Sequence, residues 1–221
     1  MKSGKKSVYE EFPKAKNLFS GISWKITDNP FFEFWCEFEE TENTAKNIKK
    51  SLILGKVEKN VVVDGILVLG KNSLIKAGTR IEGTVFIGEN CTIGPNAYLR
   101  SNVFIQDNCH IANSEIKNSI ILSKSNIPHF SYVGDSIIGE NVNFGAGTKI
   151  ANLRFDNGNV NVELNGKKVD SGRRKLGCLI GHNSKLGINC SINCGIIVGN
   201  SCFIYPSRVV GKNLGNKEIL Q

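Results

Sequence analysis

The sequence predicts an all-β fold, a parallel β-helix in which a short strand and a turn repeat every six residues. From Val63 to Ile111, every sixth residue is aliphatic at nine consecutive positions. A second unbroken run at the same spacing extends from Ile180 to Val210. An α-helix repeats at about 3.6 residues and a simple strand at about 2, so the spacing fits neither. It fits stacked coils, each closed by three repeats, with the aliphatic side chains inside.

Residues 1–58 form a segment ahead of the repeats, which occupy residues 59–221. Residues 30–38 are rich in aromatic side chains, and residues 39–52 have the composition of a charged helix. Repeat proteins need to cover the exposed end of the stack, so we expect this segment to cap the first coil.

The first run continues past Ile111 with steps of five or six residues, and the two runs supply about five coils and about two more. Residues 153–176 then interrupt the period. Their alternating stretch 160–164 and the pair Asn165-Gly166 predict a β-hairpin inserted between the runs. The inward positions that continue the first run are Ile116, Leu122, Ile127, Val133, Ile138, Phe144 and Ile150.

The composition favours a reduced protein with a small acidic ligand. A net charge of +8 suits a phosphorylated small molecule as well as nucleic acid. The aromatic residues are not interleaved with basic ones, which argues against nucleic acid. The sequence shows no secretory signal and no apolar run that spans a bilayer, so we expect a cytoplasmic protein without membrane partners. Five cysteines lie two residues before an inward aliphatic and are expected to be core residues, not zinc ligands: Cys91, Cys109, Cys178, Cys190 and Cys202.

The repeat also places polar residues relative to one another, because residues one coil apart stack at about 4.8 Å. Arg100 and Lys117 follow aliphatic residues of one face on neighbouring coils, and Asn152 lies further along that edge. We interpret the two cations as unpaired until an anion such as phosphate binds between them; the alternative is two solvated surface cations. His129 lies at a corner of a second face, with Ala146 one coil later. A neutral imidazole suits deprotonation of an amine or hydroxyl group, and a structural histidine is the alternative.

Two parts of the sequence are similar to known enzymes. Residues 128–139, which include His-Phe-Ser-Tyr, and the Gly-Ala-Gly-Thr of residues 145–148 resemble the acetyltransferase domain of bacterial bifunctional N-acetylglucosamine-1-phosphate uridyltransferases. Residues 151–156 and 171–177 are similar to archaeal sugar-1-phosphate nucleotidyltransferase/amino-sugar acetyltransferases. The resemblance covers about residues 61–211 and implies a left-handed parallel β-helix that forms homotrimers with sites between subunits. It does not extend to the nucleotidyltransferase domain, so we expect no uridylyl transfer.

The resemblance implies a role for each matching residue. His129 corresponds to the catalytic histidine, and Glu115 would orient that imidazole or hold the amine. The remaining matches are phosphate-binding Arg100 and Lys117, sugar-binding Tyr132, Asn143 and Asn152, and coenzyme-A-contacting Ala146 with Tyr205 near a second such position. Arg173 and Arg174, in the charged loop before the last coils, are candidates for the coenzyme phosphates or are simply solvated.

We therefore expect an acetyl-CoA-dependent N-acetyltransferase for nucleotide-sugar biosynthesis, without a metal. Its acceptor would be glucosamine 1-phosphate or galactosamine 1-phosphate. A γ-class carbonic anhydrase would need clustered histidines, but His110, His129 and His182 are far apart in register. The non-enzyme alternative is a sugar-phosphate binding module, or a scaffold for a separate nucleotidyltransferase partner.

Overall fold

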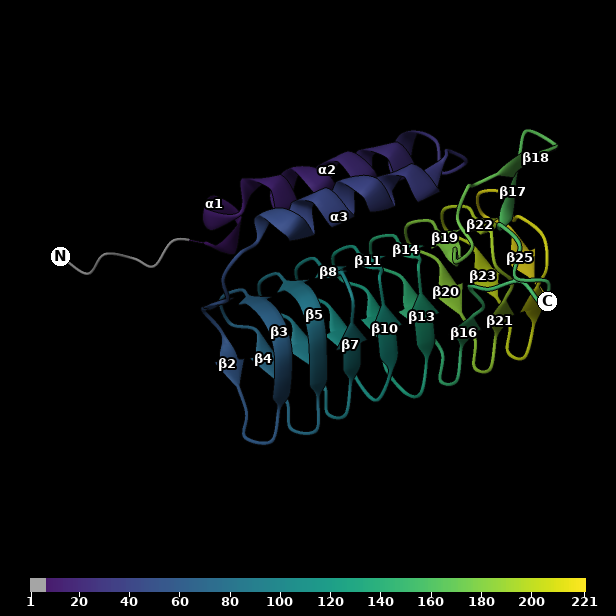
Figure 1. The fold of residues 1–221 in the computed structure, drawn as a ribbon. Coiled ribbons are helices and arrows are strands. Elements are labelled where there is room, and N and C mark those ends of the chain that lie inside the picture. Colours follow the sequence, from purple (N-terminus) through teal and green to yellow (C-terminus); the bar gives the residue numbers. More distant parts are fainter. Residues whose placement is uncertain (1–6) are drawn as a thin grey trace.

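The computed structural model describes residues 7–221 and contains a parallel β-solenoid with three faces (Figure 1). Each strand of the solenoid pairs in parallel with strands one coil away, as Val63 does with Ile81. The predicted β-helix is therefore confirmed. Nine strands stack on the first face, one from each coil. The solenoid therefore has more coils than the seven or so expected, because β2 and β25 lie outside the two runs. The first face consists of β2 (Lys56–Val57), β4 (Leu74–Ile75), β6 (Thr92–Ile93), β9 (His110–Ile111), β12 (Asn126–Ile127), β15 (Asn143–Phe144), β20 (Lys185–Leu186), β23 (Phe203–Ile204) and β25 (Ile219–Leu220).

The second and third faces belong to one sheet, because the long strands β3 (Val62–Leu69) and β5 (Arg80–Ile87) run across both. The second face also contains β7 (Tyr98–Arg100), β10 (Glu115–Lys117), β13 (Tyr132–Gly134), β16 (Lys149–Ile150), β21 (Ser191–Ile192) and β24 (Val209–Val210). The third face also contains β1 (Leu52–Ile53), β8 (Val103–Ile105), β11 (Ile120–Ile121), β14 (Ile137–Ile138), β19 (Cys178–Ile180) and β22 (Ile196–Val198).

The interior of the solenoid is the predicted aliphatic column, with one step corrected. Ile121 fills the interior instead of Leu122, because β11 places Ile121 between Ile105 and Ile138. Leu122 packs in a second cluster outside the coil. Val63, at the start of the first run, is 41% exposed. The five cysteines predicted to be core residues are all buried there as free thiols.

Asparagine residues form many of the corners between strands. Asn72, Asn90 and Asn108 stand at equivalent corners of successive coils with φ of 59°, 57° and 60°. Asparagine tolerates this left-handed conformation better than most residues with a side chain. The Asn72 side-chain amide also donates to Asn90 Oδ1 at 3.1 Å. The corners thus stack with their side chains hydrogen-bonded between coils.

The N-terminal segment forms helices that lie along the third face (Figure 1). This corrects the expectation of a cap over the first coil: the helices pack beside successive coils, and the solenoid already begins at Leu52. Residues 1–6 of the predicted segment lie outside the described residues. Across residues 7–221, no helix is both long and apolar enough to cross a membrane. The helices are α1 (Val8–Glu11), α2 (Pro13–Asp28), η1 (Phe34–Cys36) and α3 (Glu37–Asn47).

An outward apolar column on the third face explains why the helices pack there. On this face the residue just before each inward aliphatic is also apolar, so the strands are buried on both sides. The helix residues Phe19 and Phe38 are buried against this column. Its members are Val68, Phe86, Phe104, Ile120, Ile137, Leu179 and Ile197.

The insertion forms the predicted β-hairpin, made of β17 (Asn161–Leu164) and β18 (Lys167–Asp170) in antiparallel pairing. Its turn residues Asn165 and Gly166 have φ of 50° and 73°, the positive values that a two-residue hairpin turn of this kind requires. A bridge between Leu153 and Lys175 closes its base.

Candidate functional site

Polar side chains form a row along the outer surface of the second face. In β7, β10 and β13 the middle residue points inward and its two neighbours point outward, as strand geometry requires. Glu115 lies between Tyr98 and Tyr132, and Lys117 lies opposite Arg100. The predicted stacking of Arg100 and Lys117 is confirmed.

The expectation that these two cations are unpaired is wrong. Arg100 Nε donates to Glu115 Oε1 at 2.7 Å, and Lys117 Nζ donates to both carboxylate oxygens of Asp135 at 3.0 and 2.9 Å. The Arg100 guanidinium also lies over the Tyr98 ring, 5.6 Å from its centroid. The six-residue repeat predicts only which residues lie directly opposite one another on successive coils. Arg100–Glu115 and Lys117–Asp135 are instead diagonal pairs, in which the partners are offset along the chain from the directly opposed residues. The four charged groups therefore balance one another.

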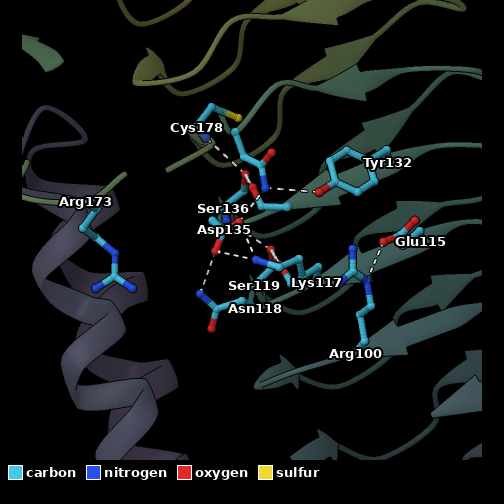
Figure 2. A network of polar contacts seen from close by, with 12 residues as sticks. Arg100, Glu115, Lys117, Asn118, Ser119, Tyr132, Asp135, Ser136, Arg173 and Cys178 are labelled. Carbon is cyan, nitrogen blue, oxygen red and sulfur yellow. Dashed lines mark hydrogen bonds and ion pairs between the residues drawn. The ribbon is translucent and has the colours of Figure 1, made fainter. Parts of the chain in front are cut away.

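The row passes Tyr132 and Asp135 (Figure 2) and continues to Asn152, which follows β16. Its side-chain amide donates to Asp135 Oδ2 at 2.6 Å and to the Tyr132 hydroxyl oxygen at 3.1 Å. Burial, together with the nearby Glu115 and Asp135 carboxylates, raises the pKa of the Tyr132 phenol. The phenol therefore keeps its proton at neutral pH, and among residues 7–221 no acceptor is hydrogen-bonded to that proton. It is available to a ligand.

His129 lies at the corner between β12 and β13, beside this row. Its backbone has φ of 68°, its N–H donates to Ala112 O, and its carbonyl accepts from Gly147 N–H at 2.8 Å. The exposed imidazole makes no side-chain hydrogen bond within residues 7–221. These contacts fix the backbone of the residue and leave both ring nitrogens accessible.

Ala146 lies in the corresponding corner one coil further on, as the repeat predicts. The N–H of its neighbour Gly145 donates to Leu186 O at 2.8 Å. The Ala146 N–H has no hydrogen-bond acceptor in the described part of the chain. One backbone donor thus remains open beside His129.

The other expected site residues lie away from the row. Asn143 is exposed on the first face, in register with Asn126 and Lys185, and the half-exposed Tyr205 follows β23 on that face. One chain therefore does not bring Asn143 and Asn152 together, because they project from different faces.

Arg173 and Arg174 lie at the base of the insertion. Figure 2 shows Arg173 beside the helices and apart from the row. Its guanidinium pairs with Glu42 of α3 at 3.3 Å and lies over the Phe38 ring, 5.1 Å from the centroid. Arg174 donates to Asn157 Oδ1 at 3.2 Å. Arg173 thus connects the insertion to the helices, and binding coenzyme phosphates would require it to leave these partners.

The sequence matches the family described as the GMPPB C-terminal domain over residues 81–219, which is more than half of the chain. The chain belongs to this family. It is 48% identical over 188 residues to a bifunctional sugar-1-phosphate nucleotidylyltransferase/acetyltransferase of Sulfurisphaera tokodaii, covering 85% of this chain and 47% of the relative. It is 44% identical over 202 residues to the bifunctional protein GlmU of Methanocaldococcus jannaschii, covering 91% and 48%. The chain spans about half the length of these relatives.

Among solved structures, a UDP-N-acetylglucosamine acyltransferase from Campylobacter jejuni aligns with 75% of this chain and 68% of its own. The identity is 14% and the TM-score 0.43, a similarity too low to bear on function.

The structure adds Asp135 and Asn118 to the row. Neither residue was among the predicted site residues, although the register of the repeat could have indicated both. Lys117 lies opposite Gly134, so the same register places Asn118 opposite Asp135. Both follow second-face strands of neighbouring coils, which is the rule that selected Arg100 and Lys117.

The three histidines lie in different environments. His110 is on the first face and His129 at a corner, while His182 packs against α2, with Nε2 3.1 Å from Ser23 O. No cluster of three or more His, Cys, Asp or Glu side chains able to hold a metal occurs within residues 7–221.

Proposed function

We propose that this chain is an acyltransferase that moves the acetyl group of acetyl-CoA to the amine of an amino-sugar 1-phosphate. The observation that carries the proposal is the charge-balanced row beside an imidazole with both nitrogens accessible. Arg100 and Lys117 offer donors for a phosphate, and the nearby Glu115 carboxylate suits an ammonium group. A ligand that carries both charges matches the row without adding net charge.

In the proposed reaction, the bound ammonium first releases one proton to solvent, and the neutral amine then attacks the thioester carbonyl directly. A C–N bond forms, the C–S bond breaks, and the amine proton passes to His129 and then to the departing thiolate. The open Ala146 N–H would donate to the developing oxyanion. Tyr132 and Asn152 would hold the sugar ring, and no acyl-enzyme is required.

We further propose that the active unit is a homotrimer. The helices cover the third face, which leaves the first and second faces for contact between copies. Apolar side chains are exposed on or beside these two faces, including Phe130 at 74% and Val209 at 66%. Contact between a first face and a second face would bring Asn143 of one copy near the row of another. Tyr205, which follows β23 on the first face, would then lie near the same contact between copies.

The decisive experiment measures release of free coenzyme A thiol from acetyl-CoA by the purified protein. Glucosamine 1-phosphate, galactosamine 1-phosphate and no acceptor are compared. Loss of a general base typically slows a reaction by about 10²–10⁴-fold, so His129→Ala is expected to abolish acceptor-dependent release. His182→Gln is the matched control, because it changes a histidine that packs against α2 on another side of the solenoid.

Acceptor-dependent release that His129→Ala leaves unchanged would remove the proposed base. Binding of the sugar phosphate without release of thiol would favour a binding module or a scaffold for a separate nucleotidyltransferase. The absence of both binding and release would overturn the proposed function.

A further inference from the structure

Asp135 is a buried carboxylate at the corner after β13, where its backbone has φ of 50°. Its side chain is 4% exposed, and that of Lys117 is 13% exposed. Oδ1 accepts from Lys117 Nζ at 3.0 Å and Asn118 Nδ2 at 2.9 Å. Oδ2 accepts from Lys117 Nζ at 2.9 Å and Asn152 Nδ2 at 2.6 Å. Both oxygens are thus occupied by donors from the protein.

The donors come from the two neighbouring coils. Lys117 and Asn118 precede Asp135 by one coil (Figure 2), and Asn152 follows it by one. Asp135 therefore joins residues far apart in the sequence at the point where the proposed sugar phosphate binds. Because its oxygens face these donors, its influence on a ligand must act through them.

For Lys117, the carboxylate restricts a flexible side chain. A lysine ammonium on a four-carbon stem has many rotamers, and binding a ligand in one of them loses conformational entropy. Two hydrogen bonds to Asp135 select the rotamer before the ligand arrives. The ammonium has three N–H donors, so it can still offer one to a phosphate.

For Asn152, the carboxylate decides which end of the amide faces outward. An ionised carboxylate only accepts hydrogen bonds, so the Asn152 nitrogen must face Asp135. The same nitrogen also donates to the Tyr132 hydroxyl. Asn152 Oδ1 is then left to accept a hydrogen bond from a sugar hydroxyl or amine.

From these contacts we infer that Asp135 is a positioning residue that fixes Lys117 and Asn152 for the amino-sugar phosphate. The inference rests on the proposed function and adds to it a residue that does not touch the substrate. It differs from a purely structural role in one respect: it predicts a defect specific to the sugar phosphate.

The test is Asp135→Asn. An amide cannot accept from all of these donors, and its own N–H groups would face one of them. We expect the KM for the amino-sugar phosphate to rise about tenfold or more, since a hydrogen bond to a charged group is lost. The KM for acetyl-CoA should stay within about twofold. The side-chain amide signals of Asn152 in ¹⁵N spectra should shift in the ligand-free variant.

Asp107→Asn is the matched control. Asp107 is another corner aspartate, and its Oδ1 accepts from the Tyr9 hydroxyl and from Glu89 N–H, away from the row. We expect this variant to lower stability while the KM for the sugar phosphate stays unchanged.

A second variant keeps the inference testable if Asp135→Asn does not fold. Asn118→Gly removes one donor to Asp135 and keeps a backbone that tolerates φ of 43°. We expect a smaller, severalfold rise in the same KM.

Each outcome has a separate meaning. Wild-type turnover with an unchanged KM in the folded variants would overturn the role of Asp135 and leave the proposed function standing. A wild-type protein that neither binds nor acetylates an amino-sugar phosphate would overturn the proposed function, and the role of Asp135 with it. A rise in KM shared by Asp107→Asn would show that general destabilisation is the cause, which would also overturn the inference.

Discussion

Truncation of Phe86 tests whether the outward apolar column holds the helices against the solenoid. Phe86 is fully buried, and its ring stacks on Phe104 with centroids 6.0 Å apart and planes 10° apart. It also lies 5.9 Å from the ring of Phe19 in α2. Burying such a side chain contributes about 1.5–3 kcal/mol. With the cavity that remains, Phe86→Ala should cost about 3–5 kcal/mol.

The two tryptophans allow the helices to be followed separately. Both Trp24 and Trp35 belong to the N-terminal segment, and only Trp35 is buried. Its fluorescence during urea unfolding therefore reports on the helices, whereas circular dichroism at β-sheet wavelengths follows the solenoid. A cost of about 3–5 kcal/mol corresponds to a fall of about 1–5 M in the fluorescence midpoint, for a slope of about 1–3 kcal/mol/M in urea.

Phe155→Ala is the control, because Phe155 lies fully exposed in the insertion. It should change the free energy of unfolding by less than about 0.5 kcal/mol. A fluorescence midpoint that falls no further in Phe86→Ala than in this control would refute the reasoning. An equal fall in both signals would mean that helices and solenoid unfold as one cooperative unit.

Two further predictions follow from single residues. Arg173→Ala removes a partly exposed ion pair to Glu42 and a cation–π contact, so we expect a loss of about 1 kcal/mol in the Trp35 transition; an increased KM for acetyl-CoA at unchanged stability would instead support a coenzyme role. For His110, burial and the nearby Lys76 and His129 lower the pKa below 6.5. Below pH 6.5 the unfolded chain then binds more protons than the folded one, so stability falls on acidification. In His110→Gln, the thermal midpoint should therefore change less between pH 7 and pH 5 than in the wild-type protein. An equal change in both proteins would contradict this explanation.

The sequence predicted the solenoid because the period is long and nearly unbroken, but it left one step ambiguous. Between Ile116 and Ile127, steps of five and six residues can come in either order, and Ile121 and Leu122 are both aliphatic. Ile121, and not Leu122, points into the solenoid because Ile120 then points outward and extends the apolar column beneath the helices. Pairs of neighbouring apolar residues recur on successive coils of this face and only on some coils of the other two, and this signal would have placed the helices there as well.

The candidate site was predictable in part for the same reason. Stacking follows from the repeat, so Arg100 and Lys117 could be placed together from their numbers alone. Diagonal partners depend on side-chain length and corner geometry, which the repeat does not specify. Glu115, expected to orient the imidazole or hold the amine, is paired with Arg100, and Asp135 was not among the predicted site residues.

The position of the helices bears directly on where a complete site can form. The helices cover the apolar column of the third face and leave the first and second faces of the solenoid uncovered within residues 7–221. The edge between these two faces carries His129, with the polar row on one side and Asn143 on the other. Had the N-terminal segment capped the first coil instead, the third face would expose its apolar column and compete for the same contacts. By covering that column, the helices leave the edge at His129 as the place where neighbouring copies would meet in the trimer we propose.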